Sequence, residues 1–270
     1  MALSQGYLLI ALGRKYIDEC VFLAKTLRMQ DDFRPISLLI HKEDEGYALS
    51  KSKFDKLIHF NPQGDIWDDC QNNFEKYCLY PRLYFPDYLP YYETIIVDSD
   101  VLCQYYTGYI WDYLSNRTLP IAMTGRLYDP KWHWGTIQNV SNKFGRSVPH
   151  THGGFFYLRS EPFLDEFFKY CRSIFWAYDD LGCKRWYQNG RVDEIIFAIA
   201  HANYDMRPIE FDDFPIMSFN YTPDMQIPSR LQTEGGQNIQ MNNYIPFIHM
   251  FDKMEGENFQ TLYKKIMHEI

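Results

Sequence analysis

The sequence predicts an α/β fold with a mostly parallel sheet that is flanked by helices. Two observations lead to this prediction. Apolar segments of strand length recur through the first hundred residues, and segments with apolar residues at helical spacing separate them. The strand segments are apolar throughout, as is typical of parallel strands that are buried on both faces.

The elements of the first half follow in a regular order. Residues 7–12 form a compact apolar run, and the segment 15–29 places Ile17, Val21, Ala24 and Leu27 on one helical face. Two more strands are then expected, followed by a helix and a long apolar run. They cover residues 34–41, 56–60, 74–85 and 94–103.

The second half has longer connections. Strands are expected at 119–125 and 153–159, joined by an aromatic and polar loop. Such long loops are uncommon inside a compact domain unless they are functional. No linker or internal repeat is visible, so we predict a single domain over residues 1–270. The remaining expected elements are helices at about 161–178 and 192–202, a loop at about 218–243, an apolar run at 244–251 and a terminal helix.

Composition and charge exclude some classes of protein. The net charge is −8 and no run of lysine or arginine occurs, which argues against nucleic-acid binding. No stretch approaches the roughly 20 apolar residues of a transmembrane helix, and no secretory leader is recognisable. The six cysteines show no CxxC pair or zinc-ligand spacing. We therefore expect reduced, structural thiols and a cytoplasmic protein.

Two aspartates interrupt the apolar run TIIVDSDVLC. Along a strand, alternation places Asp98 and Asp100 on one side and Ser99 on the other. Adjacent carboxylates repel each other unless water or a divalent cation lies between them. In open α/β sheets ligands bind beyond the carboxyl ends of strands, which is where this pair falls. The pair is either a solvated strand end or part of a metal site.

The segment YPRLYFPDYLPYYETIIVDSDVL resembles the approach to the Asp-x-Asp motif in glycosyltransferases of the GT-A fold. The likeness is greatest to family eight, which includes glycogenin and bacterial galactosyltransferases of lipopolysaccharide synthesis. Arg82 lies sixteen residues before Asp98, close to the family's spacing. The resemblance implies a GT-A fold and an arginine that contacts the donor diphosphate or sugar. Otherwise Arg82 is a surface cation of a helix.

The end of the first predicted strand, ALGRKY, fits the same family. There the strand end cradles the nucleotide. The resemblance implies backbone contacts from Ala11, Leu12 and Gly13 and a uracil-stacking ring at Tyr16. Tyr16 is equally explained as an ordinary aromatic residue at a helix start.

Two later segments also match the family's order. THGGFFYLR resembles an Asn-x-Gly segment whose backbone lies against the donor sugar, and the paired Gly153 and Gly154 suit close approach. Otherwise the two glycines form a simple tight turn. His152 stands where the family usually has asparagine, which puts the hydrogen bonding there in doubt. GRVDEIIFAIA resembles an Asp-Gln pair that opens a helix. Asp193 and Glu194 either act on a hydroxyl or simply favour the helix N-terminus.

The last landmark is IPFIHMFDKMEG, which resembles the family's His-x-x-Gly-x-x-Lys segment. The resemblance implies that His249 is the third protein ligand of the metal. Otherwise His249, at the end of an apolar run, is a hydrogen-bonded histidine of the core. The family's glycine and lysine positions hold Asp252 and Glu255, so the clamp on the diphosphate is either absent or rebuilt from Lys253.

The resemblance implies a metal-dependent glycosyltransferase. It would move a hexose from UDP-glucose or UDP-galactose to a hydroxyl acceptor, with retention of configuration. Residues 1–103 would form the nucleotide-binding half and 104–270 the acceptor-binding half. Mn²⁺ or Mg²⁺ would be held by Asp98, Asp100 and His249, with Asp98 and Ser99 also near the donor. If the enzyme inverts, Asp193 is the candidate base. The predicted acceptor-binding residues are Tyr128, Trp132, Trp134 and Glu194. The loop that carries the three aromatic residues is equally explained as a packed lid.

Three other classes stay open. A non-catalytic nucleotide-sugar or carbohydrate-binding module would keep the fold without turnover. A sugar nucleotidyltransferase usually carries a glycine-rich basic loop after the first strand, which ALGRKYIDE lacks. A metal-dependent phosphohydrolase needs further ligands at metal-site spacing, and the sequence shows no such cluster. The sequence does not indicate an oligomeric state.

Overall fold

The computed structural model describes residues 4–30, 32–51, 53–71, 75–128, 137–185, 189–211, 213–218 and 245–250. The chain divides into two compact units that alternate along the sequence. The first unit comprises 1–60, 95–117 and 215–270, and the second comprises 61–94 and 118–214. The division of a single domain into halves at residue 103 stays a prediction.

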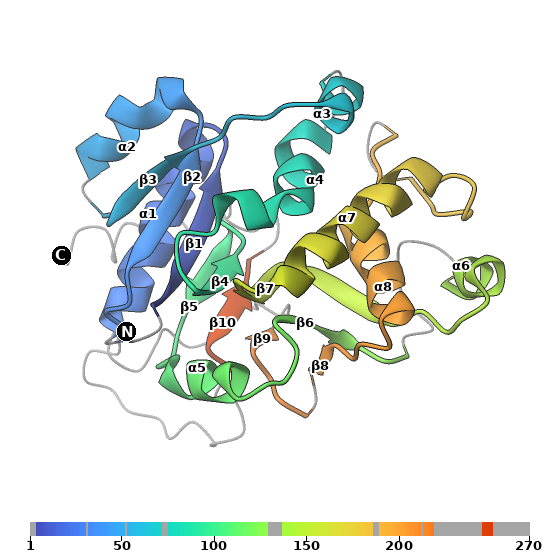
Figure 1. Cartoon of the computed structure of the whole chain (residues 1–270). Coiled ribbons are helices and arrows are strands. Elements are labelled where there is room, and N and C mark those ends of the chain that lie inside the picture. Colours follow the sequence, from blue (N-terminus) through green and yellow to red (C-terminus); the bar gives the residue numbers. More distant parts are fainter. Residues whose placement is uncertain are drawn as a thin grey trace. The chain divides into compact units, whose positions relative to one another are not determined.

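The first unit contains the parallel strands expected from the N-terminal apolar runs (Figure 1). The larger sheet of the protein has seven strands, and in this unit their order is β3-β2-β1-β4. β1 pairs in parallel with β2, and β2 with β3. Helix α1 packs on β1 with its apolar face buried. The bounds are β1 Gln5–Ala11, α1 Arg14–Met29, β2 Ile36–Ile40, β3 Lys56–His59 and β4 Glu93–Val97.

The apolar run 94–103 was expected to form one continuous strand, and this expectation was wrong. β4 ends at Val97, a turn follows, and β5 (Val101–Cys103) joins a separate three-stranded sheet with the order β5-β10-β9. β10 (Phe247–His249) is antiparallel to β5 and parallel to β9 (Met217–Ser218). The reason is that β5 finds its hydrogen-bond partner about 145 residues later, which local sequence cannot indicate.

The second unit is built on β7 (His150–Arg159), β6 (Ile121–Arg126) and β8 (Ile209–Glu210), in that order. β6 is antiparallel to β7 and parallel to β8. Helix α8 (Asp193–Asn203) packs on β7, and α7 (Pro162–Ala177) packs on α8. Their apolar faces give this unit an aromatic core.

The other described helices connect these strands. In the second unit, α6 lies within the segment 126–152, which was expected to be loop throughout, so that expectation was wrong for α6. The expected loop 219–243 and the terminal helix lie outside the described residues. The bounds are η1 Lys42–Asp44, α2 Glu45–Lys51, α3 Asp65–Cys70, α4 Glu75–Leu83, η2 Phe85–Tyr88, α5 Gly108–Ser115 and α6 Ile137–Phe144.

The described cysteines fit the prediction of structural thiols. Cys20, Cys70, Cys103, Cys171 and Cys183 are free and buried. Burial raises the pKa of the Cys20 and Cys171 thiols well above the ordinary value, and it raises the pKa of Cys183 to about 12. These thiols therefore stay protonated and unreactive at neutral pH.

Membrane insertion was also examined through the helices. None of the helices in the described ranges combines the length and the hydropathy needed to cross a membrane.

Phe167 lies at the centre of the aromatic core of the second unit. Its ring is fully buried and lies 5.5 Å from the Phe168 ring and 6.4 Å from the Phe197 ring. We expect Phe167→Ala to lower the free energy of unfolding by about 3–5 kcal/mol, because it opens a cavity among these rings. Urea unfolding measures this change. Lys169→Ala, at an exposed position of the same helix, should change it by no more than about 0.5 kcal/mol.

Candidate functional site

Three ligand-type side chains of the first unit converge at the turn between β4 and β5. His249 Nε2 lies 3.1 Å from Asp100 Oδ1 and 3.8 Å from Asp98 Oδ2. One ligand atom from each of the three residues lies within 4.8 Å of the others. The three residues predicted as metal ligands are therefore brought together.

The register of β10 explains how His249 reaches this turn. His249 is paired with Val101, the first residue after the turn. The next residue, Met250, donates its backbone N–H to the Asp100 carbonyl oxygen at 2.8 Å. A residue about 150 positions away in the sequence is thus fixed beside the carboxylates by backbone pairing.

The donor set fits a divalent cation. The two carboxylates are half-buried and the imidazole is 5% exposed, so the ligands are held in place yet remain accessible on the carboxylate side. Carboxylate oxygens suit Mg²⁺ and Mn²⁺, and a nitrogen ligand favours Mn²⁺. The pKa of the nearby Cys20 thiol is raised first by burial and then by the charges of Glu19, Asp98 and Asp100. A cation would relieve this concentration of negative charge.

A turn, and not strand alternation, sets the aspartates side by side. Asp98, Ser99 and Asp100 all lie between β4 and β5, so the alternation argument was wrong. The Ser99 hydroxyl donates to Glu19 Oε2 at 2.6 Å, which ties the turn to helix α1. The predicted contact between Ser99 and the nucleotide-sugar substrate stays a prediction. Glu19 was missed, because nothing in the sequence marks it among the polar residues of α1.

The predicted nucleotide segment lies where β1 passes into α1. Ala11 and Leu12 are buried, and Tyr16 is 39% exposed in the first turn of the helix. Gly13 has a φ of 129°, a conformation that L-residues with side chains rarely adopt. Glycine is therefore required there by the backbone. Nucleotide contacts from these residues stay predictions.

In the second unit, Arg82 and Asp193 form a close ion pair over Gly153. Arg82 Nη1 hydrogen-bonds Asp193 Oδ2, and both side chains are largely buried. A Cβ at Gly153 would lie 2.6 Å from Asp193 Oδ2 and 2.7 Å from Arg82 Nη1. Glycine is needed here because the ion pair occupies the space of a side chain. The proposed sugar contact is a separate matter and stays a prediction.

His152, which stands where the resembled family usually has asparagine, lies close to Glu194. His152 Nε2 lies 3.6 Å from Glu194 Oε1, which also accepts the Gly153 N–H at 3.1 Å. The Gly154 N–H donates to His152 Nδ1 at 3.0 Å. Histidine and glutamate thus hold the glycine segment together. Glu194 is only 7% exposed, and its predicted role in acceptor binding stays a prediction.

The remaining predicted residues are only partly described. Tyr128 is 74% exposed directly after β6, as an acceptor-binding ring would need to be. Trp132, Trp134 and Lys253 lie outside the described residues.

Comparisons with known proteins identify the fold. No family model and no curated protein matches the sequence. Among solved structures, the chain is similar to galactosyltransferase LgtC in complex with donor and acceptor sugar analogues. The TM-score is 0.51 at 15% identity, over 72% of this chain and 69% of the other. The TM-score to mouse xyloside xylosyltransferase 1 is 0.54 at 10% identity, over 91% of this chain and 97% of the other. The TM-score to WbbM, a bifunctional glycosyltransferase, is 0.53 at 11% identity, over 75% of this chain and 38% of the other.

The chain therefore has a glycosyltransferase fold of the GT-A class, with a mixed, mostly parallel sheet flanked by helices. The predicted fold class is confirmed.

The crowding over Gly153 yields a prediction. We expect Gly153→Ala to lower the free energy of unfolding by about 1–3 kcal/mol, because the added methyl group forces apart or displaces the Arg82–Asp193 pair. Urea unfolding measures the change. At Gly46 in α2 a Cβ meets nothing within 4 Å, so Gly46→Ala should be neutral or stabilise by up to about 1 kcal/mol. Equal effects of the two variants would contradict the argument.

Proposed function

We propose that the protein is a metal-dependent glycosyltransferase. It transfers a hexose from a UDP-sugar, UDP-glucose or UDP-galactose, to a hydroxyl group of an acceptor, with retention of configuration. The observation that carries the proposal is the convergence of Asp98, Asp100 and His249 in a chain with a glycosyltransferase fold.

The residues of the metal centre have one task in this reaction. A nucleoside diphosphate leaves the sugar, so negative charge grows on its β-phosphate oxygens. Asp98, Asp100 and His249 would hold a Mn²⁺ or Mg²⁺ ion, which when bound would supply Lewis-acid stabilisation of that charge. The three ligands are fixed before substrate binds, since β5, β10 and the turn hold them.

The second unit supplies the other proposed groups. Arg82 provides positive charge for the diphosphate or a hydrogen bond to the sugar. Asp193 binds a sugar hydroxyl, or it accepts the proton of the acceptor if the reaction inverts. Their mutual ion pair orients both side chains. Support for a sugar donor and a sugar acceptor comes from the LgtC structure, which contains analogues of both.

The donor can be tested by thermal shift. We expect UDP-glucose or UDP-galactose to raise Tm only when Mn²⁺ or Mg²⁺ is present, since a ligand that binds only the folded state stabilises it. GDP- and ADP-sugars serve as controls for the base. If no nucleotide or nucleotide-sugar stabilises the protein with either metal, the proposal is overturned.

The metal ligands can be tested by substitution. Asp100→Ala should abolish the metal-dependent shift and reduce donor turnover by at least about 100-fold, because it removes a charged ligand. Asp112→Ala is the matched control, an exposed acid on α5 of the same unit. It should bind metal and donor as the unchanged protein does.

Product analysis separates the alternative classes. Release of UDP and free hexose without an acceptor indicates a transferase that hydrolyses its donor slowly. Donor binding without any turnover indicates a binding module, and formation of pyrophosphate from a sugar phosphate and UTP indicates a nucleotidyltransferase.

A further inference from the structure

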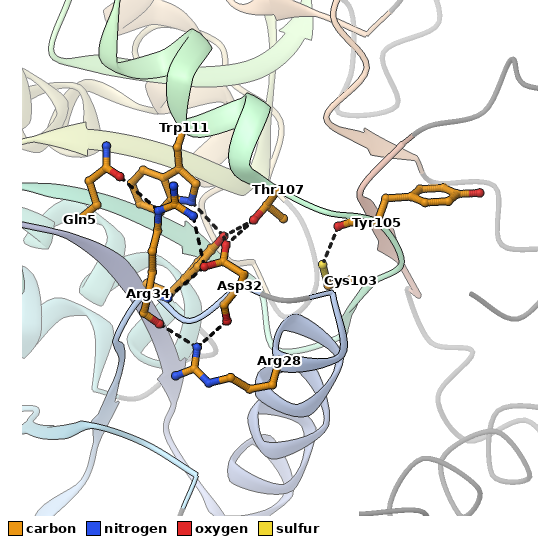
Figure 2. Close-up of polar contacts among 9 residues, drawn as sticks. Gln5, Arg28, Asp32, Arg34, Cys103, Tyr105, Thr107 and Trp111 are labelled. Carbon is orange, nitrogen blue, oxygen red and sulfur yellow. Dashed lines mark hydrogen bonds and ion pairs between the residues drawn. The ribbon is translucent and has the colours of Figure 1, made fainter. Parts of the chain in front are cut away.

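A buried carboxylate lies at the centre of a polar network in the first unit. The Asp32 side chain is fully buried. Asp32 Oδ2 accepts hydrogen bonds from the Tyr7 hydroxyl, at 2.6 Å, and from the Thr107 hydroxyl. Asp32 Oδ1 accepts the Arg34 N–H at 3.0 Å and Arg34 Nη1 at 3.2 Å. Figure 2 shows the side chains of Asp32, Arg34 and Thr107 pointing toward one another. A buried charge persists only with such partners.

The network connects three parts of the first unit. Tyr7 lies in β1, and Asp32 lies in the connection between α1 and β2. Thr107 is the residue that directly precedes α5. The Trp111 Nε1–H of α5 donates to the Tyr7 hydroxyl at 3.0 Å. Arg28 Nη1 binds the Asp32 carbonyl oxygen at 2.7 Å, so the backbone that carries the carboxylate is held as well. Thr107 is therefore anchored in a rigid part of the core.

The short segment between β5 and Thr107 contains Gln104, which hydrogen-bonds the two residues that precede β10. The Gln104 N–H donates to the Pro246 carbonyl oxygen at 2.8 Å. Its side-chain Nε2 donates to the Ile245 carbonyl oxygen at 2.6 Å. Gln104 is 6% exposed, so these bonds are shielded from water. Residues 245 and 246 lead directly into the strand that ends at His249.

The opposite end of this segment is also tied down. The Cys103 N–H donates to the Thr26 hydroxyl of α1 at 3.2 Å. β5 and β10 each contain only three residues, so the ladder between them supplies few hydrogen bonds. The bonds from Gln104 therefore add to the bond of Met250 and the pairing with β9 in holding the register that places His249 opposite Val101.

We propose that Gln104 is a positioning residue for the Asp98–Asp100–His249 cluster, and that the bond between Thr107 and Asp32 anchors it. Gln104 holds the start of β10, and the strand carries the imidazole to the carboxylates. The effect on metal affinity rests on the proposed metal site. Residues that orient metal ligands typically alter metal affinity by about 10–100-fold when they are replaced.

The first test is Gln104→Met, which keeps the length of the side chain and removes its donor. We expect the Kd for Mn²⁺, measured by isothermal titration calorimetry, to rise by about tenfold. The matched control is Tyr157→Phe, which removes a buried hydrogen bond of 2.7 Å to Glu93 in the second unit. The control should lower Tm to a comparable extent and leave the Kd unchanged. A Kd for Gln104→Met equal to that of the control overturns the proposal.

The second test addresses the anchor. Thr107→Val keeps the shape of the side chain but loses the bond to Asp32, and Thr107→Ser restores a hydroxyl. We expect weaker Mn²⁺ binding in the valine variant and recovery in the serine variant. If both variants bind Mn²⁺ as the unchanged protein does, the anchor has no part in positioning the cluster.

A measurement without metal separates this inference from the proposed function. Hydrogen exchange of the β10 amides should be faster in Gln104→Met than in Tyr157→Phe, because the strand loses its hold at residue 245. If the unchanged protein binds no Mn²⁺ but this exchange is faster, the metal site fails and the positioning of β10 by Gln104 stands. Unchanged exchange overturns the positioning role, whatever the metal result.

Discussion

The pairing of β5 with β10 is the interaction on which the candidate metal centre depends. The two aspartates are fixed by a turn that leaves β4, but the imidazole arrives only because His249 is paired with Val101. The pairing is short, and it is reinforced by the Met250 N–H on the Asp100 carbonyl and by Gln104 on residues 245 and 246. The two aspartates and the histidine are thereby held mainly by hydrogen bonds to the backbone of β10 and of the residues before it.

In the second unit, several charged side chains lie close together and are largely buried. Arg82 and Asp193 neutralise each other over Gly153, and Glu194 accepts the Gly153 N–H while facing His152. Each charge thus has a partner of opposite sign or a hydrogen-bond donor, which is the condition for burying it. The absence of a side chain at Gly153 is what makes room for the first pair.

The fold and the convergence of the three predicted metal ligands could be anticipated from the sequence for an identifiable reason. Apolar runs and helical spacing are local signals, and they placed β1, β2, β3, α1, α7 and α8 close to their observed bounds. His249 was found through the order of motifs. The break after Val97 was missed, since a strand's partner cannot be read from the strand itself. Gln104 and Asp32 were missed too, because their importance arises from distant carbonyl and hydroxyl groups.

The long interval between the aspartates and His249 has a consequence for synthesis of the chain. A polypeptide that has emerged only as far as α8 already contains both carboxylates but lacks the imidazole. Contacts between residues so far apart form late, because a large loop must close before they contribute. From the synthesis of Asp100 until that of His249, the nascent chain therefore carries an incomplete set of the proposed ligands. The proposed metal site is complete only when β10 joins the small sheet.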